Sequence, residues 1–305
     1  MANILTRTTP RRLLNRGLSF VHFEKPGLRG FASASLLPHI HASEVGASQN
    51  ADHVQQVNQH LKDRGIIKIS LQFEDENSTY LEQLIRQLNK NHDHGLPITH
   101  SASRGWFWDV RPQPAALAAA ATTNQARSET MNNFPWHTDC SYEESPPKYF
   151  ALQVLRPDQC GGGTLSVLDS TRLMSLLSPA ARNTLSKPEF RITVPPEFIK
   201  NENDTHIVSN VLWVDEKLGK AQLRFREDII EPLTPRGETA LRELQHVLES
   251  ANTQQEVLNL TPDMLPRGSI VAMDNRRWLH ARNIVRDPNR HLRRVRWDAR
   301  PFNAM

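Results

Sequence analysis

The chain has 305 residues, of which 38% are hydrophobic and 23% are charged. This length suits one large domain or two small ones, and the composition is typical of a globular protein rather than a disordered one. No run approaches the roughly 20 apolar residues that a membrane span needs. The two cysteines, Cys140 and Cys160, are too few for a disulfide framework or a four-cysteine zinc site. A reducing compartment is therefore expected.

The net charge of +4 comes from the first 31 residues, which hold six basic residues and one acid. The rest of the chain is therefore nearly neutral. This distribution excludes a basic nucleic-acid-binding surface on the rest of the chain. The sequence also has no homeodomain, zinc-finger or RNA-recognition motif. The six basic residues are Arg7, Arg11, Arg12, Arg16, Lys25 and Arg29.

An arginine-rich segment with almost no acid is typical of a mitochondrial presequence. The residues Arg29-Gly-Phe31-Ala also resemble the pattern at which matrix presequences are cleaved, which would leave Ala32 as the first residue. We therefore expect residues 1–31 to direct the protein to the mitochondrial matrix. The alternative is a disordered basic tail on a cytoplasmic protein.

After this segment, the spacing of apolar residues predicts helices and short strands. Four segments have apolar residues on one helical face: 51–64, 78–92, 171–186 and 236–251. Ser78 is the expected N-cap of the second helix. Eight segments are predicted as strands: 66–71, 149–155, 164–168, 190–195, 206–214, 220–226, 269–274 and 293–298. Many short strands separated by turns predict a mainly β protein with appended helices, either a sandwich or a double-sheet barrel.

Residues 32–64 are expected to form a lead-in with one short helix, followed by a single domain over residues 65–305. The connection 95–136 shows no clear element, and so long a connection is usually functional or partly disordered. Trp106 and Trp108 lie in it. They either cover a site or pack within the connection.

The sharpest local motif is His137-Thr-Asp139. In an extended segment, residues i and i+2 point to the same side, so His137 and Asp139 could offer a nitrogen and an oxygen to one metal ion. The pair by itself also fits an ordinary surface turn, because the chain has 13 histidines and 33 acids.

Further residues with matching chemistry lie near the C-terminus. His280 follows the predicted strand 269–274 and would complete a set of two histidines and one carboxylate. Such a set leaves three coordination positions open, as non-haem Fe(II) oxygenases require. Arg290 and Arg294 follow, and a guanidinium can bind a carboxylate through two parallel hydrogen bonds, which suits a dicarboxylate cosubstrate.

Together these motifs resemble the taurine dioxygenase (TauD/TfdA-like) family of Fe(II)- and 2-oxoglutarate-dependent oxygenases. The resemblance covers about residues 65–300 and depends on the order and spacing of four features: His137-x-Asp139, Thr164, Asp274-Asn-Arg-Arg-Trp-Leu-His280 and Arg290-His-Leu-Arg-Arg294. It implies a double-stranded β-helix, a jelly roll with the metal between its two sheets.

The resemblance also implies the metal ligands, which would be His137, Asp139 and His280. Halogenating relatives lack the carboxylate so that chloride can bind iron. The presence of Asp139 therefore implies hydroxylation, or another oxygen-driven outcome such as desaturation or ring formation.

For the cosubstrate, the resemblance implies that Thr164 binds 2-oxoglutarate and that Arg290 binds its far carboxylate. Arg294 would lie near the cosubstrate or an anionic substrate. Arg293 and Arg296 alternate with Arg294 and are expected to face outward. The remaining candidates are expected to be packing or surface residues, namely His206, His246, His291 and the two thiols.

The expected protein is thus an Fe(II)- and 2-oxoglutarate-dependent dioxygenase that uses O₂ to oxidise a small molecule, with release of succinate and CO₂. A small carboxylate or an amino-acid derivative is the expected substrate, because the Cys/His zinc module of carnitine-pathway relatives is missing. A homo-oligomer is compatible with the sequence. The alternatives are a metal-dependent non-oxygenase of the same fold and a catalytically inactive binding protein.

Overall fold

The computed structural model describes residues 37–99, 105–112, 126–199, 201, 203–215 and 220–302. The expected presequence, residues 1–31, lies outside the described residues. Within those ranges, no helix combines the length and the apolar character needed to cross a membrane.

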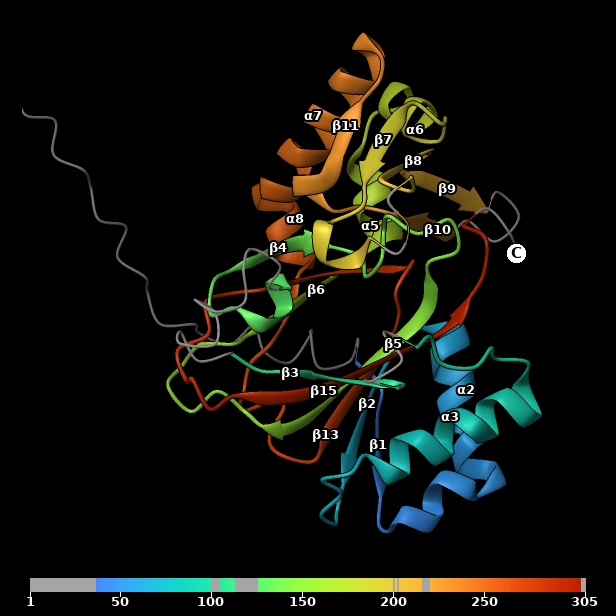
Figure 1. Ribbon diagram of the computed structural model, residues 1–305, viewed down its shortest axis with the longest axis vertical. Helices are drawn as coiled ribbons and strands as arrows, with labels where there is room; N and C mark the ends of the chain where they lie inside the picture. Colours follow the sequence, from blue (N-terminus) through green and yellow to red (C-terminus); the bar gives the residue numbers. More distant parts are fainter. Residues whose placement is uncertain are drawn as a thin grey trace, which may run out of the picture. The chain divides into compact units, whose positions relative to one another are not determined.

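Two β-sheets form the centre of the fold (Figure 1). The larger has six strands in the order β1 (His39–Ala42), β2 (Ile66–Leu71), β13 (Ser269–Asp274), β5 (Pro147–Arg156), β15 (His291–Ala299) and β3 (Phe107–Val110). The smaller has four strands in the order β12 (Leu258–Leu260), β6 (Leu165–Asp169), β14 (Trp278–Arg282) and β4 (Phe134–His137). β1 and β2 are parallel, and the other neighbours in both sheets are antiparallel.

The inner faces of the two sheets share one hydrophobic core. Phe150 and Val271 of the larger sheet pack in the same cluster as Val167 and Leu258 of the smaller sheet. Two sheets that face each other across a shared core are the double-stranded β-helix that the family resemblance implies. The polar site described below lies between these sheets.

Helices α2 (Ala51–Asp63) and α3 (Thr79–His92) cover the outer face of the larger sheet (Figure 1). Both match their predicted ranges closely. Val57 and Leu84 on the helices pack with Ile67 and Ile270 on the sheet. β1 and α2 therefore share this sheet and its core with strands that follow residue 65.

Ser78 occupies the N-cap position of α3 as predicted, but its side chain does not cap the helix. Ser78 has a left-handed backbone with a φ of 60° and makes no capping hydrogen bond. The carboxylate of Asp75 accepts from the backbone N–H groups of Thr79 at 2.8 Å and Tyr80 at 2.9 Å instead. A carboxylate at a helix N-terminus satisfies free N–H groups and favours the helix dipole.

A third group of elements packs on the outer face of the smaller sheet, where Leu168 and Leu279 contact Leu185 and Leu244. It contains the helices α5 (Ser170–Leu176), α6 (Pro179–Leu185), α7 (Pro235–Glu249) and α8 (Ala251–Glu256). Its strands are β7 (Phe190–Thr193), β8 (His206–Ser209), β9 (Leu212–Asp215), β10 (Lys220–Leu223) and β11 (Ile230–Pro232). Short 3₁₀ helices are η1 (Val45–Gln49), η2 (Arg127–Glu129), η3 (Pro196–Phe198) and η4 (Glu227–Ile229).

Two predicted elements are each divided in two. The helix predicted over 171–186 breaks before Pro179, which lacks an N–H and starts α6, while Ser178 caps that helix. The strand predicted over 206–214 breaks at Asn210, whose side chain donates to the backbone of Leu212. Six short strands had no clear pattern in the sequence: 39–42, 107–110, 134–137, 230–232, 258–260 and 278–282.

Candidate metal centre

The two predicted histidine ligands come from neighbouring strands of the smaller sheet. His137 on β4 lies directly opposite His280 on β14, and their ring centroids are 4.1 Å apart. Both side chains are buried. Phe134 stacks on His137 at 3.6 Å between ring centroids, and Phe150 of the larger sheet lies 4.5 Å from His280. Aromatic rings from both sheets therefore shield the histidine pair from water.

Asp139 is brought to the same point, although not by a strand. β4 ends at His137, so the expected i, i+2 alternation of an extended segment does not apply to Asp139. Its Oδ1 nevertheless lies 3.8 Å from His137 Nε2 and 3.7 Å from His280 Nε2. One ligand atom from each of the three residues lies within 4.8 Å of the other two.

The protonation states of these groups suit a cation. Pro135 O lies 2.8 Å from His137 Nδ1, which places the proton there and leaves Nε2 as the electron-pair donor. Burial, with His280 nearby, lowers the pKa of His137 well below its usual value. Burial would raise the pKa of Asp139, but Arg294 and the neighbouring His280 and Arg296 outweigh it and hold that pKa well below its usual range. Neutral imidazole and ionised carboxylate are the forms that bind metals.

The donor set therefore fits a divalent first-row transition metal such as Fe(II). Asp139 supports this fit, because its buried Oδ1 faces the Nε2 atoms of both histidines while its Oδ2 lies on the side of Arg294. Among the residues that the structure describes, this is the one group of three histidines, cysteines or acids close enough to hold an ion.

Two cavities adjoin the candidate metal centre. We call the first the clamp cavity; its lining includes His280, Leu165, Arg282 and Arg290. The second, here the acceptor cavity, is lined by Asp139, Cys140, Tyr142, Phe198, Arg226 and Arg296, among others. His137 and Arg294 line both. A metal held by the triad would thus face two separate spaces.

Arg290 is among the residues that line the clamp cavity. Its side chain is buried, and no described carboxylate lies within ion-pair distance of it; Asp158 is close enough only to oppose part of the fall in its pKa. Burial and the nearby Arg282 lower its pKa to about 9, which still leaves it a cation at neutral pH. Gly163 makes room for it, because a Cβ there would lie 3.0 Å from Arg290 Nε. A buried guanidinium without a carboxylate partner is costly unless an anion binds it.

The structure does not bring Thr164 into that cavity. Its backbone N–H donates to Asn283 Oδ1 at 2.8 Å, immediately before β6 begins. The following residue, Leu165, lines the cavity instead. The cosubstrate role that the resemblance implies for Thr164 thus has no support from this geometry.

Arg294 reaches the centre from the larger sheet, with Nη1 3.3 Å from Asp139 Oδ2. The prediction that Arg296 faces outward is wrong. Arg296 is buried, donates to Cys140 Sγ and lies 3.9 Å from Asp139 Oδ2. Residues i and i+2 of a strand share a side, so the position of Arg294 could have identified Arg296. Arg293 does face away and pairs with Asp109 at 2.9 Å.

The two tryptophans of the 95–136 connection have different surroundings. Trp108 on β3 is buried and lies 6.0 Å from the guanidinium of Arg294, so it borders the centre. Trp106 instead lies beneath the guanidinium of Arg86 on α3, at 4.3 Å.

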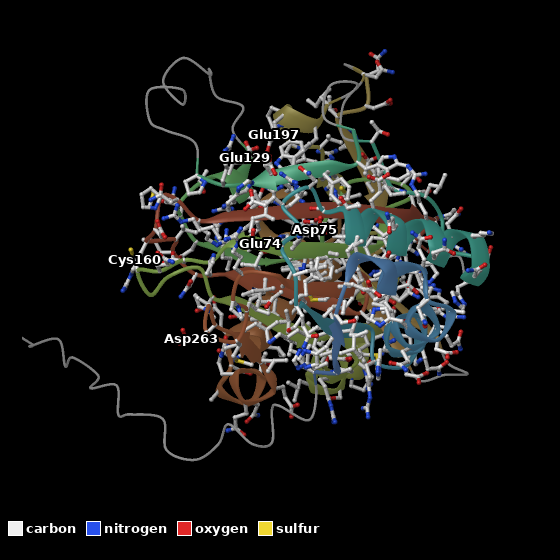
Figure 2. All side chains as sticks on the ribbon, turned by 90° about the horizontal axis from the view of Figure 1, so that it is seen from below. Glu74, Asp75, Glu129, Cys160, Glu197 and Asp263 are labelled. Carbon is white, nitrogen blue, oxygen red and sulfur yellow. The ribbon has the colours of Figure 1, made fainter. Side chains whose placement is uncertain are left out.

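The remaining candidates lie outside the site. His206 and His246 are exposed, and His291 pairs with Asp109 at 3.0 Å. Cys160 is exposed and lies at the edge of the ribbon, in the turn between β5 and β6 (Figure 2). Cys140, in contrast, is buried within the acceptor cavity lining.

The chain is similar to known proteins in both sequence and structure. The family model described as "Taurine catabolism dioxygenase TauD, TfdA family" matches residues 28–296. A curated relative, the 3-((Z)-2-isocyanoethenyl)-1H-indole synthase of Fischerella ambigua (strain UTEX 1903), is 24% identical over 176 residues. That match spans 54% of this chain and 63% of the relative, which is less than two thirds of the relative's length.

Solved structures share the fold at low sequence identity. Asparagine oxygenase in complex with Fe(II), 2S,3S-3-hydroxyasparagine and succinate has a TM-score of 0.64 and 22% identity, over 84% of this chain and 83% of that one. The non-heme iron oxygenase OrfP in complex with Fe and alpha-ketoglutaric acid has a TM-score of 0.59 and 19% identity, over 82% and 81% of the two chains.

Proposed function

Because the chain belongs to the taurine catabolism dioxygenase TauD, TfdA family, we propose that it is an Fe(II)- and 2-oxoglutarate-dependent dioxygenase. The observation that carries the proposal is the buried triad of His137, Asp139 and His280 beside a cavity into which the unpaired guanidinium of Arg290 projects. A non-oxygenase metal enzyme would need no clamp for a dicarboxylate cosubstrate beside its metal ligands.

Each residue has a definable task in this proposal. His137, His280 and Asp139 hold Fe(II), which when bound couples the decarboxylation of 2-oxoglutarate to substrate oxidation by O₂. Arg290 neutralises the carboxylate of 2-oxoglutarate that is remote from the metal, through a charge-assisted pair in a buried cavity. The Phe134 and Phe150 rings exclude water from the histidines.

For the primary substrate, we propose a small carboxylate or amino-acid derivative that occupies the acceptor cavity and is hydroxylated. Arg294 and Arg296 supply buried positive charge there, and Tyr142 and Phe198 supply stacked aromatic walls with centroids 5.4 Å apart. The similar asparagine oxygenase structure holds a hydroxyasparagine, and a similar OrfP structure holds a hydroxy-L-Arg. The carboxylate ligand Asp139 favours hydroxylation over halogenation.

Anaerobic titration of the Fe(II) protein with 2-oxoglutarate tests the cofactor assignment directly. We expect a metal-to-ligand charge-transfer band that saturates with 2-oxoglutarate. Adding O₂ with a panel of amino acids and small carboxylates should then give O₂ uptake coupled to succinate formation. Binding of metal without the band would favour a non-oxygenase, and a protein that binds neither would favour an inactive binding protein.

We also propose that residues 1–31 direct the protein to the mitochondrial matrix. Their arginine-rich, acid-poor composition supports this, and the family match begins only at residue 28. A fluorescent fusion of the full chain should localise to mitochondria, and deletion of residues 1–31 should move it to the cytosol. A full-length fusion that stays cytosolic, with no cleavage near Phe31, would contradict this.

A further inference from the structure

The carboxylate ligand Asp139 lies beyond the end of β4, so something other than the strand must hold it. We propose that Asn275 is the positioning residue that fixes Asp139 and thereby sets the affinity of the centre for its metal. This proposal rests on the metal assignment made above.

Asn275 follows β13 on the larger sheet and is 1% exposed. Its carboxamide holds Asp139 from both sides. Its Oδ1 accepts from the backbone N–H of Asp139 at 2.7 Å, and its Nδ2 donates to the backbone carbonyl of Asp139 at 2.9 Å. These two bonds engage both backbone polar groups of the ligand residue.

Asn275 is itself anchored to the start of β5. Its Nδ2 also donates to the carbonyl of Pro147 at 2.9 Å, and its backbone N–H donates to the carbonyl of Lys148 at 2.7 Å. The hydrogen bonds therefore run from a central strand pair of the larger sheet, through one side chain, to the backbone of the residue that carries the metal carboxylate.

The backbone conformation near Asp139 is one that hydrogen bonds must stabilise. Cys140, directly after it, has a φ of 54°, a left-handed conformation that is uncommon for residues other than glycine. Such a conformation persists when surrounding contacts determine it. Without the carboxamide of Asn275, the turn would gain alternative conformations, and metal binding would have to order it again. Removing a group that orients a metal ligand typically weakens metal binding about 10- to 100-fold.

A purely structural role for Asn275 makes a different prediction. Loss of three buried hydrogen bonds lowers the stability of the fold whether or not Asp139 is a ligand. The test must therefore measure metal affinity separately from stability. Asn58 offers a matched control, because it is also buried and its amide bonds to His92 and His94 among the helices that cover the outer face of the larger sheet.

We would titrate Co(II) into the metal-free forms of the full chain and follow the visible absorption of the bound ion, with urea unfolding measured in parallel. Asn275→Ala should weaken Co(II) binding at least about tenfold and change the Co(II) spectrum. Asn58→Ala should lower the free energy of unfolding and leave the Co(II) affinity as in the parent.

Asn275→Asp keeps the acceptor for the Asp139 N–H and loses both donors, so we expect a smaller loss of affinity. Its added negative charge would by itself strengthen Co(II) binding. Weaker Co(II) binding in this variant would therefore result from a changed position of Asp139. This near-isosteric variant carries the test if Asn275→Ala does not fold. Parent-like Co(II) affinity and spectrum in the folded variants would overturn the proposal. A parent protein that does not bind Co(II) would instead overturn the metal assignment beneath it.

Discussion

His137 and His280 are equivalent in exposure but differ in what holds their rings. His137 Nδ1 bonds to a backbone carbonyl, whereas His280 Nδ1 is buried with no hydrogen-bond partner among the described residues. The ring of His280 is therefore oriented by packing against Phe150 and by its position opposite His137 on the sheet. Both nitrogens that face Asp139 are available to an ion.

We expect either His137→Ala or His280→Ala to abolish Fe(II) binding at micromolar metal. Two remaining ligands cannot hold a labile divalent ion tightly, and the lost nitrogen has no substitute nearby. Anaerobic Fe(II) titration followed by equilibrium dialysis measures this. His246→Ala, on the exposed face of α7, is the control and should bind as the parent does. Parent-like affinity in either ligand variant would remove the triad assignment.

Arg290→Ala should raise the dissociation constant of 2-oxoglutarate at least about tenfold. A charge-assisted bond to a buried carboxylate contributes roughly 1.5–3 kcal/mol, and 1.4 kcal/mol corresponds to one decade. The charge-transfer band in anaerobic titrations reports this constant directly. Fe(II) binding should survive, because Arg290 is not a ligand.

Two further variants test which residues serve the clamp cavity and the acceptor cavity. Thr164→Val should raise the dissociation constant of 2-oxoglutarate less than Arg290→Ala does, since Leu165 rather than Thr164 lines the clamp cavity. Arg294→Ala should raise the KM of the primary substrate more than that of 2-oxoglutarate if Arg294 serves the acceptor cavity. An unchanged constant in Arg290→Ala would show that another group binds the far carboxylate.

At the scale of single elements, α3 shows how one side chain defines a helix start. Asp75 binds two N–H groups of the first turn, while its own carbonyl accepts from Gln153 Nε2 on β5 at 2.6 Å. The cap therefore also joins the helix to the larger sheet.

Asp75→Ala should lower the free energy of unfolding by about 0.5–2 kcal/mol, the usual cost of losing an N-cap. Urea unfolding monitored by circular dichroism measures it. Ser78→Ala is the comparison, because that hydroxyl makes no capping bond and the backbone conformation stays the same. A larger loss in Ser78→Ala than in Asp75→Ala would contradict the assignment of the cap.

At the scale of the whole described fold, a buried polar network joins the helical layer to the larger sheet. Trp297 Nε1 on β15 donates to His94 Nδ1 at 3.1 Å, and His94 Nε2 lies 3.2 Å from Asn58 Oδ1 on α2. His94 also stacks on Tyr149 of β5 with centroids 4.7 Å apart. These partners require a neutral imidazole, and burial lowers the pKa of His94 to about 4.

This network should make stability depend on pH. The unfolded chain takes up the His94 proton near pH 6.5 and the folded chain only near pH 4, so stability is full above pH 6.5 and falls as the pH drops between these values. At about 1.4 kcal/mol per pH unit, the total loss is about 3 kcal/mol. Urea unfolding at several pH values measures the slope of the unfolding free energy against pH. His94→Gln should have a shallower slope than the parent, and equal slopes would contradict this role.

The sequence by itself determined the local periodicities and the chemistry of the motifs. Helices α2, α3 and α7 were predictable because each buries one apolar face, and strands β2, β5 and β13 because each is a short apolar run buried on both faces. His137, Asp139, His280 and Arg290 could be named as candidates because the order and spacing of their motifs resemble one family. The short strands β3, β4 and β14 were not, because four or five residues carry too little periodicity.

Only the tertiary structure decided how those residues meet. The two histidines lie together because β4 and β14 pair across more than 140 residues of sequence, and Asp139 joins them through Asn275 rather than through an extended strand. Arg296 enters the site because it shares a strand face with Arg294 on β15, whereas Thr164 precedes β6 and Leu165 lines the clamp cavity in its place. Local sequence encodes which groups are present, whereas strand register and long-range hydrogen bonds determine which of them share a site.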